Sequence, residues 1–165
     1  MAAFLLGLVA TLAGCAHYQL GTGSAPKFSS LFVAPVTTEA LIPQAQALFT
    51  TQLREALLRD GRVMLADSAA DADAVLQITL VGYDRTVAVA RADDTGLARR
   101  FDVTLRAQAS LTDNRTKQAY FTKRILTAKR GVFTDSGQVP AEYQALALLA
   151  EQLAGNAVHA VLDTW

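Results

Sequence analysis

The residue with the clearest chemistry in this chain of 165 residues is its only cysteine, Cys15. It ends the run Leu12-Ala13-Gly14-Cys15, and residues 2–12 are apolar apart from one threonine. An apolar stretch this short is typical of a secretory signal peptide, because it cannot cross a membrane as a helix. A branched apolar residue, two small residues and a cysteine form the pattern of a lipobox, in which the thiol takes a diacylglyceryl group. We therefore expect cleavage after Gly14 and an acyl anchor, such as palmitate, on Cys15.

Basic side chains form the second set of residues that suggest a chemistry. The whole chain balances 15 basic against 15 acidic residues, but residues 99–130 carry nine Lys or Arg and only two Asp. Arg106 lies on one predicted strand, while Lys123 and Arg124 lie on the next, so Arg106 and one of the other two are expected to share a solvent-facing side. Guanidinium and ammonium groups suit phosphates, and these three are the predicted phosphate-binding residues. Ordinary solubilising charge is the alternative interpretation for each of them.

The other reactive residue types do not fall into a catalytic or metal-binding pattern. His17 and His159 are the only histidines and there is no second cysteine, so we predict no metal site and no disulfide. No Gly-x-Ser-x-Gly motif presents a serine nucleophile. Paired aspartates lie in turn-like segments, and the four tyrosines are too scattered to stack nucleic-acid bases. The sequence thus predicts no catalytic residue, no cofactor and no nucleic-acid partner.

Hydrophobic periodicity predicts the elements that carry these residues. Residues 101–112 alternate apolar and polar side chains without interruption, which indicates a strand with one buried and one wet face. Two helices with an apolar stripe are predicted, one from Pro43 to about Arg59 and one from Pro140 almost to Trp165. Further strands are predicted at residues 31–36, 62–66, 74–84 (with 87–90 as an extension) and 119–130.

The order of these elements predicts an α+β fold. The economical packing is two helices on one face of a mostly antiparallel, about four-stranded sheet, with the other face left polar. Residues 1–14 are expected to be a lipoprotein signal peptide, 15–30 a lipidated tether, and 31–165 a single α/β sandwich domain.

Several short motifs resemble the LptE family of LPS-assembly lipoproteins. Residues 15–21 (CAHYQLG) are similar to the family's opening after the lipidated cysteine, and residues 31–37 (LFVAPVT) to its first strand. The helix end at 57–61 (LLRDG), the strand entry at 72–78 (ADAVLQI) and the long terminal helix follow in the same order. The chain departs from the family pattern after the first strand, where Thr37-Thr38-Glu39 replaces the usual asparagine.

This resemblance implies a non-enzymatic outer-membrane lipoprotein that is anchored by lipid on the periplasmic side. Members of the family plug the LptD β-barrel and assist lipopolysaccharide transport and assembly. The implied ligand is lipopolysaccharide, whose lipid A phosphates would meet Arg106, Lys123 and Arg124. Two other functions stay open: an auxiliary lipoprotein of a lipid-transport ABC system, and an exported hydrolase.

Overall fold

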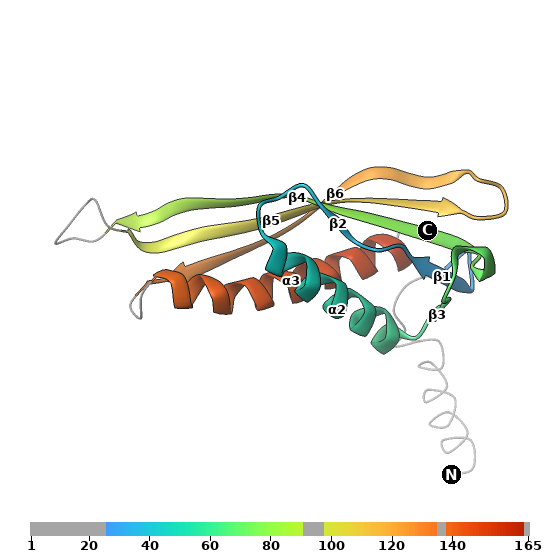
Figure 1. The fold of residues 1–165 in the computed structure, drawn as a ribbon, viewed down its shortest axis with the longest axis horizontal. Coiled ribbons are helices and arrows are strands. Elements are labelled where there is room, and N and C mark those ends of the chain that lie inside the picture. The colour runs from blue at the N-terminus through green and yellow to red at the C-terminus, as the bar shows by residue number, and fades with distance from the viewer. Residues whose placement is uncertain (1–25, 91–97, 135–137, 164–165) are drawn as a thin grey trace, which may run out of the picture.

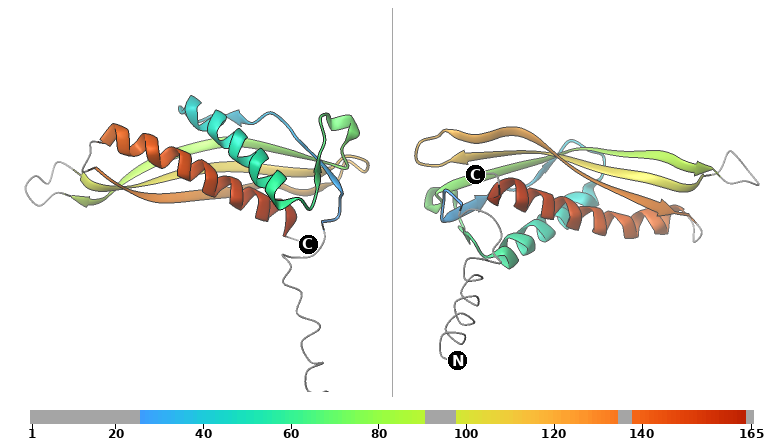
Figure 2. Two further views of the ribbon diagram at one scale, coloured as in Figure 1. Left: turned by 90° about the horizontal axis from the view of Figure 1, so that it is seen from below. Right: turned by 180° about the vertical axis from the view of Figure 1, so that it is seen from behind.

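The computed structural model describes residues 26–90, 98–134 and 138–163. In order they form β1 (Ser30–Val33), β2 (Thr37–Thr38), α2 (Pro43–Asp60), β3 (Met64–Leu65), a 3-10 turn (Ala69–Asp71), β4 (Ala74–Ala90), β5 (Ala98–Asp113), β6 (Ala119–Phe133) and α3 (Gln138–Leu162). The arrangement has two layers, a long twisted sheet and two helices that both lie against the same face of it (Figure 1). Two further views show that the opposite face carries no helix (Figure 2).

The sheet has six strands in the order β3-β1-β4-β5-β6, and β2 also pairs with β4. β4, β5 and β6 form two long antiparallel hairpins. β1 runs parallel to both β3 and β4, and β2 runs parallel to β4. The α+β class with two helices is confirmed, whereas the prediction of about four, mostly antiparallel strands is wrong, because the sheet is mixed and has six.

The parallel strand pairs follow from how the chain connects the strands, which hydrophobic periodicity does not reveal. The predicted strand 31–36 ends early, at Val33 of β1, since Pro35 has no N–H to give to a ladder, and pairing resumes beyond the predicted segment at β2. α2 then acts as a crossover between β1 and β3, and a crossover returns the chain in the parallel direction. β2 and β3 have only two residues each, which is too few to show a periodicity.

The long elements follow their sequence patterns closely. Every second residue of β5 from Val103 to Leu111 is fully buried, as the alternation predicts. α2 begins with Pro43 and ends where Gly61 adopts a left-handed conformation with φ of 71°. The Gly61 N–H donates to the Leu57 carbonyl at 3.1 Å and so satisfies one of the last carbonyls of the helix.

α3 is the central core helix of the described part of the chain. By length and composition alone its segment Val139–Leu162 could span a membrane, but 61% of the apolar 18-residue stretch within it is buried inside the domain. Leu149, Leu153 and Val161 are completely buried. We therefore attribute the apolar character of α3 to packing in the core, with which the buried stripe of α2 is continuous: Ala45, Phe49, Leu53 and Leu57.

Candidate interaction surface

The face of the sheet that carries no helix is polar, and we call it the polar face. Residues paired across neighbouring strands share a side, so the register places on it the side chains that alternate with the buried ones of β5. Hydroxyl, amide and charged groups predominate, but the apolar Val75, Ile125 and Phe133 also lie on this side, the last two more than half exposed. The polar residues of the face are Gln77, Thr79, Asp84, Thr86, Arg100, Asp102, Thr104, Arg106, Gln108, Ser110, Thr112, Thr127 and Lys129.

Ion pairs join the three cations and two carboxylates of the polar face. Arg106 Nη2 lies 2.7 Å from Asp84 Oδ2. One carboxylate oxygen of Asp102 lies 3.0 Å from Lys129 Nζ, and the other lies 3.0 Å from Arg100 Nη2. The hydrogen bonds from Lys129 and Arg100 lower the pKa of Asp102, which keeps it ionised. The face therefore presents ion-paired charges, with one cation in excess, among hydrogen-bonding side chains.

Two glycines allow the arginines to lie flat on the polar face. A Cβ on Gly82, the cross-strand partner of Arg106, would meet Arg106 Nη2 at 2.8 Å. A Cβ on Gly131 would meet Arg100 Nε at 2.8 Å in the same way. Because glycine leaves this room, each guanidinium lies across the neighbouring backbone.

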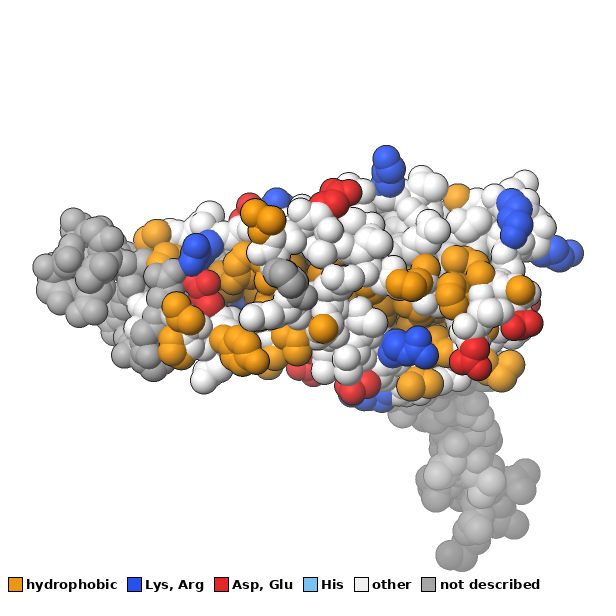
Figure 3. Space-filling view, viewed as in Figure 1, with side chains coloured by type: hydrophobic (Ala, Val, Ile, Leu, Met, Phe, Trp, Pro, Cys, Tyr) orange, Lys and Arg blue, Asp and Glu red, His pale blue; other side chains and the backbone are white. Residues whose placement is uncertain are grey.

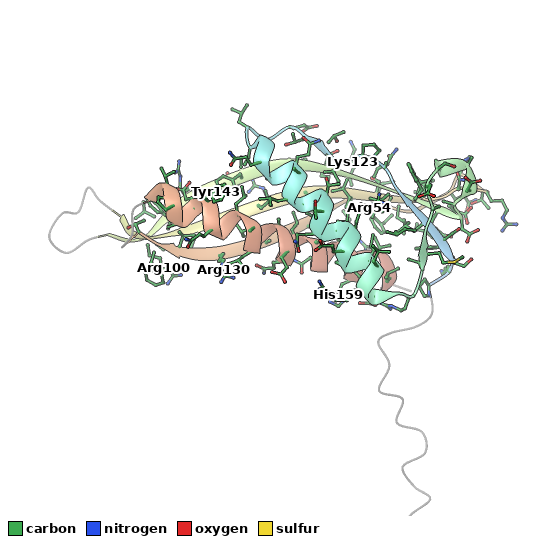
Figure 4. All side chains as sticks on the ribbon, turned by 60° about the horizontal axis from the view of Figure 1, so that its bottom comes forward. Arg54, Arg100, Lys123, Arg130, Tyr143 and His159 are labelled. Carbon is green, nitrogen blue, oxygen red and sulfur yellow. The ribbon has the colours of Figure 1, made fainter. Side chains whose placement is uncertain are left out.

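Lys123 stands apart from the paired charges. It lies at an irregularity of the β5–β6 register, has φ of 48°, and its backbone N–H donates to Ser110 Oγ at 3.0 Å. Its side chain is exposed and forms no ion pair with the residues that the structure describes. Figure 4 shows it far from Arg100 and Arg130, which lie toward the other end of the long strands. Of the three predicted phosphate-binding residues, Lys123 is the one whose charge is not already paired.

Arg124 has a different environment from Lys123 and Arg106. It pairs with the buried Ala109, so its side chain is on the helix side of the sheet. Arg124 Nη1 donates to the Ala160 carbonyl of α3 at 3.1 Å, and its guanidinium carbon lies 4.1 Å from the centre of the Phe121 ring. The three predicted residues are therefore not brought together, and Arg124 connects β6 to α3. Cys15 lies outside the described residues.

An open hollow of about 540 Å³ lies at the end of the domain where the described chain begins, and Asp73 lines it. Asp73 Oδ2 accepts hydrogen bonds from the Ser29 hydroxyl at 2.7 Å, the Ser29 N–H at 3.0 Å and the Ser30 N–H at 2.9 Å. These bonds, led by the Ser29 hydroxyl, lower the pKa of Asp73 to about 2. A general acid or base needs a pKa near the working pH, so this shift has the wrong direction for a hydrolase.

Sequence reasoning missed two kinds of residue at these surfaces. Asp84 and Asp102 neutralise the basic strands, and a predicted hairpin register would have identified them as cross-strand neighbours of Arg106 and Lys129. The hydrogen bonds between Asp73 and the start of β1 join residues more than 40 positions apart, and no local pattern signals them.

His159 is exposed on α3 beside Asp163. No cluster of three or more His, Cys, Asp or Glu residues that could hold a metal occurs within residues 26–90, 98–134 and 138–163.

The described chain is thus a small α+β domain whose polar face carries ion-paired charges and whose β6 carries an exposed lysine, an arrangement suited to binding. The sequence model of the LptE lipopolysaccharide-assembly family matches residues 28–161, and the chain belongs to this family. A comparison of this sequence with curated proteins found no significant match.

Solved structures with a similar fold include proteins described as lipoproteins. A hypothetical protein of Chlamydia trachomatis has a TM-score of 0.58 at 15% identity, covering 81% of this chain and 95% of that one. An uncharacterized lipoprotein of Nitrosomonas europaea has a TM-score of 0.57 at 14% identity, covering 87% and 86%. A minor lipoprotein of Acinetobacter baumannii has a TM-score of 0.52 at 16% identity, covering 84% and 96%. At these identities the likeness concerns the fold alone.

Proposed function

We propose that this chain is a non-catalytic outer-membrane lipoprotein that plugs an LptD-like β-barrel and assists lipopolysaccharide assembly. In this proposal residues 1–14 are removed as a signal peptide, and Cys15 becomes the acylated N-terminus on the periplasmic side. Residues 15–30 then tether the domain formed by residues 31–165. Membership of the LptE family supports the role in lipopolysaccharide assembly.

The observation that carries the barrel partnership is the polar face, whose charges are held in ion pairs. Charged side chains on a surface that stays in water need no ion-pair partners within that surface. When a partner protein covers a surface, the desolvation cost is smaller if its charges are already ion-paired. The interior of a large outer-membrane barrel is polar and hydrogen-bonding, which matches the hydroxyl and amide side chains of this face. We propose that the polar face contacts the inner wall of the barrel.

The barrel contact is tested by placing a bulky side chain on the polar face. Thr104 lies on β5 between Asp84 and Lys129, at the centre of the paired charges. Thr104→Trp in the full-length lipoprotein should lower the amount of co-purified barrel roughly tenfold, the equivalent of about 1.4 kcal/mol. Gln152→Trp is the matched control, because Gln152 is exposed on α3 on the helix side. Equal barrel recovery for both variants would disprove the contact.

The phosphates of lipid A are proposed to meet Lys123 first and Arg106 second. Lys123 is exposed and unpaired among described residues, while Arg106 must exchange Asp84 for a phosphate. Arg124 contributes by holding β6 against α3 instead of by touching the lipid. Lys123→Glu should weaken lipopolysaccharide binding by roughly tenfold at low salt, with a smaller difference at high salt. Unchanged binding at low salt would refute this role of Lys123.

A further inference from the structure

The outer edge of β4 changes character halfway along the strand. Its first half is covered, because Ala74–Leu76 pair with β1 and Thr79 and Leu80 pair with β2. The last bond on this edge is donated by the Glu39 N–H to the Leu80 carbonyl at 2.8 Å, after which the chain turns away toward α2. Beyond Leu80 no described strand pairs with this edge, and residues 84–88 are exposed.

The register shows which backbone groups point outward there. Residues of a strand direct their N–H and C=O alternately to the two sides, and Leu80 points outward. The register shift at Val81 moves the next outward position to the partner of Leu105, which is Tyr83. Arg85 and Val87 follow by alternation, before a second shift beyond Val87. The N–H and C=O of Tyr83, Arg85 and Val87 therefore form an unpaired edge, which we call the open β4 edge.

The other exposed edge of the sheet, that of β6, is guarded. The same alternation makes the Thr127 carbonyl point outward, and Asn156 Nδ2 from α3 indeed donates to it at 2.9 Å. The irregularity at Lys123 bends the strand further along, and Arg124 folds back onto α3. Proteins prevent an edge strand from pairing by bulges, by charged side chains or by covering the edge with a helix. Among the described residues, no helix side chain bonds to the open β4 edge as Asn156 bonds to β6.

An apolar groove lies beside the open β4 edge. It has a volume of about 250 Å³ and is lined by Tyr83 of β4, the start of α2 and the first turns of α3. Val139 and Tyr143 of α3 are 79% and 66% exposed, which is high for apolar side chains of these sizes. Figure 3 shows hydrophobic side chains gathered where the first turns of the two helices approach each other. The side chains of the outward residues of β4 lie on this helix side, since Tyr83 and Arg85 pair with the buried Leu105 and Val103.

We propose that the open β4 edge receives an extended segment of the partner protein, which adds as a strand and places an apolar side chain in the groove. Unpaired backbone groups in a row are matched by another extended backbone, and a neighbouring pocket selects alternate side chains of the added strand. The distance between the two register shifts limits the added strand to about six residues, Gly82–Val87. The partner here is the barrel protein of the proposed function, on which this inference rests.

The charges beside the open β4 edge are already engaged within the domain, since Arg85 Nη1 lies 2.6 Å from Glu142 Oε1 of α3 and Asp84 is paired with Arg106. The added strand is therefore held by backbone hydrogen bonds and by the apolar groove. Asp84 and Thr86 of the polar face alternate along β4 with the outward residues, so a barrel that covers the polar face also reaches this edge. A second copy of this chain on the edge is the alternative occupant that the test distinguishes.

The test uses proline as a probe of a single outward N–H. Val87→Pro removes an outward donor but no bond of the β4–β5 ladder, so the fold should be kept. Val87→Ala is the matched control, because it shortens the same side chain but keeps the outward N–H. Circular dichroism of both full-length variants verifies folding. Barrel recovery should then fall roughly tenfold for Val87→Pro and much less for Val87→Ala.

Amide hydrogen exchange gives the second readout. In the purified complex the amides of Tyr83, Arg85 and Val87 should exchange more slowly than in the free lipoprotein, whereas that of Gln152 on α3 should not change. Equal barrel recovery for wild type and Val87→Pro, or unchanged exchange at these amides, would overturn strand addition while leaving the proposed function intact. Failure of the wild type to recover the barrel would overturn both. Dimers of the free chain that Val87→Pro converts to monomers would show that a second copy occupies the edge.

Discussion

Arg106 and Asp84 form an ion pair across β4 and β5, with 2.7 Å between Nη2 and Oδ2, directly above Gly82. About half of each side chain remains exposed, 44% for Arg106 and 49% for Asp84. The pair is therefore screened by water and contributes at most about 1 kcal/mol to stability. Its main consequence is electrostatic, because it removes a free cation from the polar face.

Releasing Arg106 from this pair should increase anion binding. In Asp84→Asn the guanidinium loses its counterion, so we expect lipopolysaccharide to bind several-fold more tightly, while the free energy of unfolding changes by less than about 1 kcal/mol. Binding measured with labelled lipopolysaccharide, and urea denaturation, check the two parts. Asp67→Asn, a surface change of the same charge elsewhere, is the control. Equal binding by wild type and Asp84→Asn would mean that Arg106 does not reach the lipid.

Arg124 should prove structural, in contrast to its neighbour Lys123. Arg124→Ala removes the hydrogen bond to Ala160 and the contact with Phe121, and should cost roughly 1–2 kcal/mol in the free energy of unfolding. Lys123→Ala should cost close to nothing, since its side chain is exposed. Chemical denaturation of both variants compares them, and a similar loss for the two would contradict the different roles given to them here.

Asp73 should make stability depend on acid pH. Its pKa is about 2 in the folded protein, below the usual 3.8, so the ionised form is favoured by folding. This contribution is complete above about pH 4 and is lost as the pH falls from about 4 toward 2. Asp73→Asn should therefore lower the melting temperature at pH 5–7 but much less at pH 2. A difference between wild type and variant that stayed constant from pH 7 to pH 2 would argue against the Asp73 tie.

Two glycines should respond to alanine in opposite directions. Gly61→Ala forces a residue with a Cβ to adopt φ of 71°, which should cost about 1 kcal/mol although no atom blocks the new methyl group. Gly155 is inside α3 with no atom within 4 Å of an added Cβ, so Gly155→Ala should stabilise the helix by roughly 0.5–1 kcal/mol. Thermal melts of the two variants should move to opposite sides of the wild type. Destabilisation by both would mean that Gly155 serves a packing partner outside this chain.

The elements that the sequence predicted are those in which local periodicity and burial agree. The alternation from Phe101 to Thr112, the start at Pro43 and the stop at Gly61 each report a local constraint, and β5 and α2 follow them. α3 begins at Gln138, two residues before the predicted start at Pro140. The parallel strands were not predictable in this way. β2 consists of Thr37 and Thr38, whose strand pairing depends on Thr79 and Leu80 about 40 residues away.

The candidate surface was predictable in part. The basic residues of β5 and β6 were identified from their types, but whether each charge is free depends on the register. Arg106 and Lys123 look alike in the sequence, yet one faces Asp84 and the other sits at a register irregularity. Arg124 turns to the helix side because it pairs with Ala109, a result that only the strand alignment provides.

The most direct test of the account is purification of the native lipoprotein from its envelope, followed by mass spectrometry of the chain and its partner. We predict a chain that begins at an acylated Cys15 and co-purifies with an LptD-like barrel and lipopolysaccharide. A chain that retains an unmodified Met1, or one that co-purifies with components of an inner-membrane lipid-transport ABC system and without a barrel, would contradict the account.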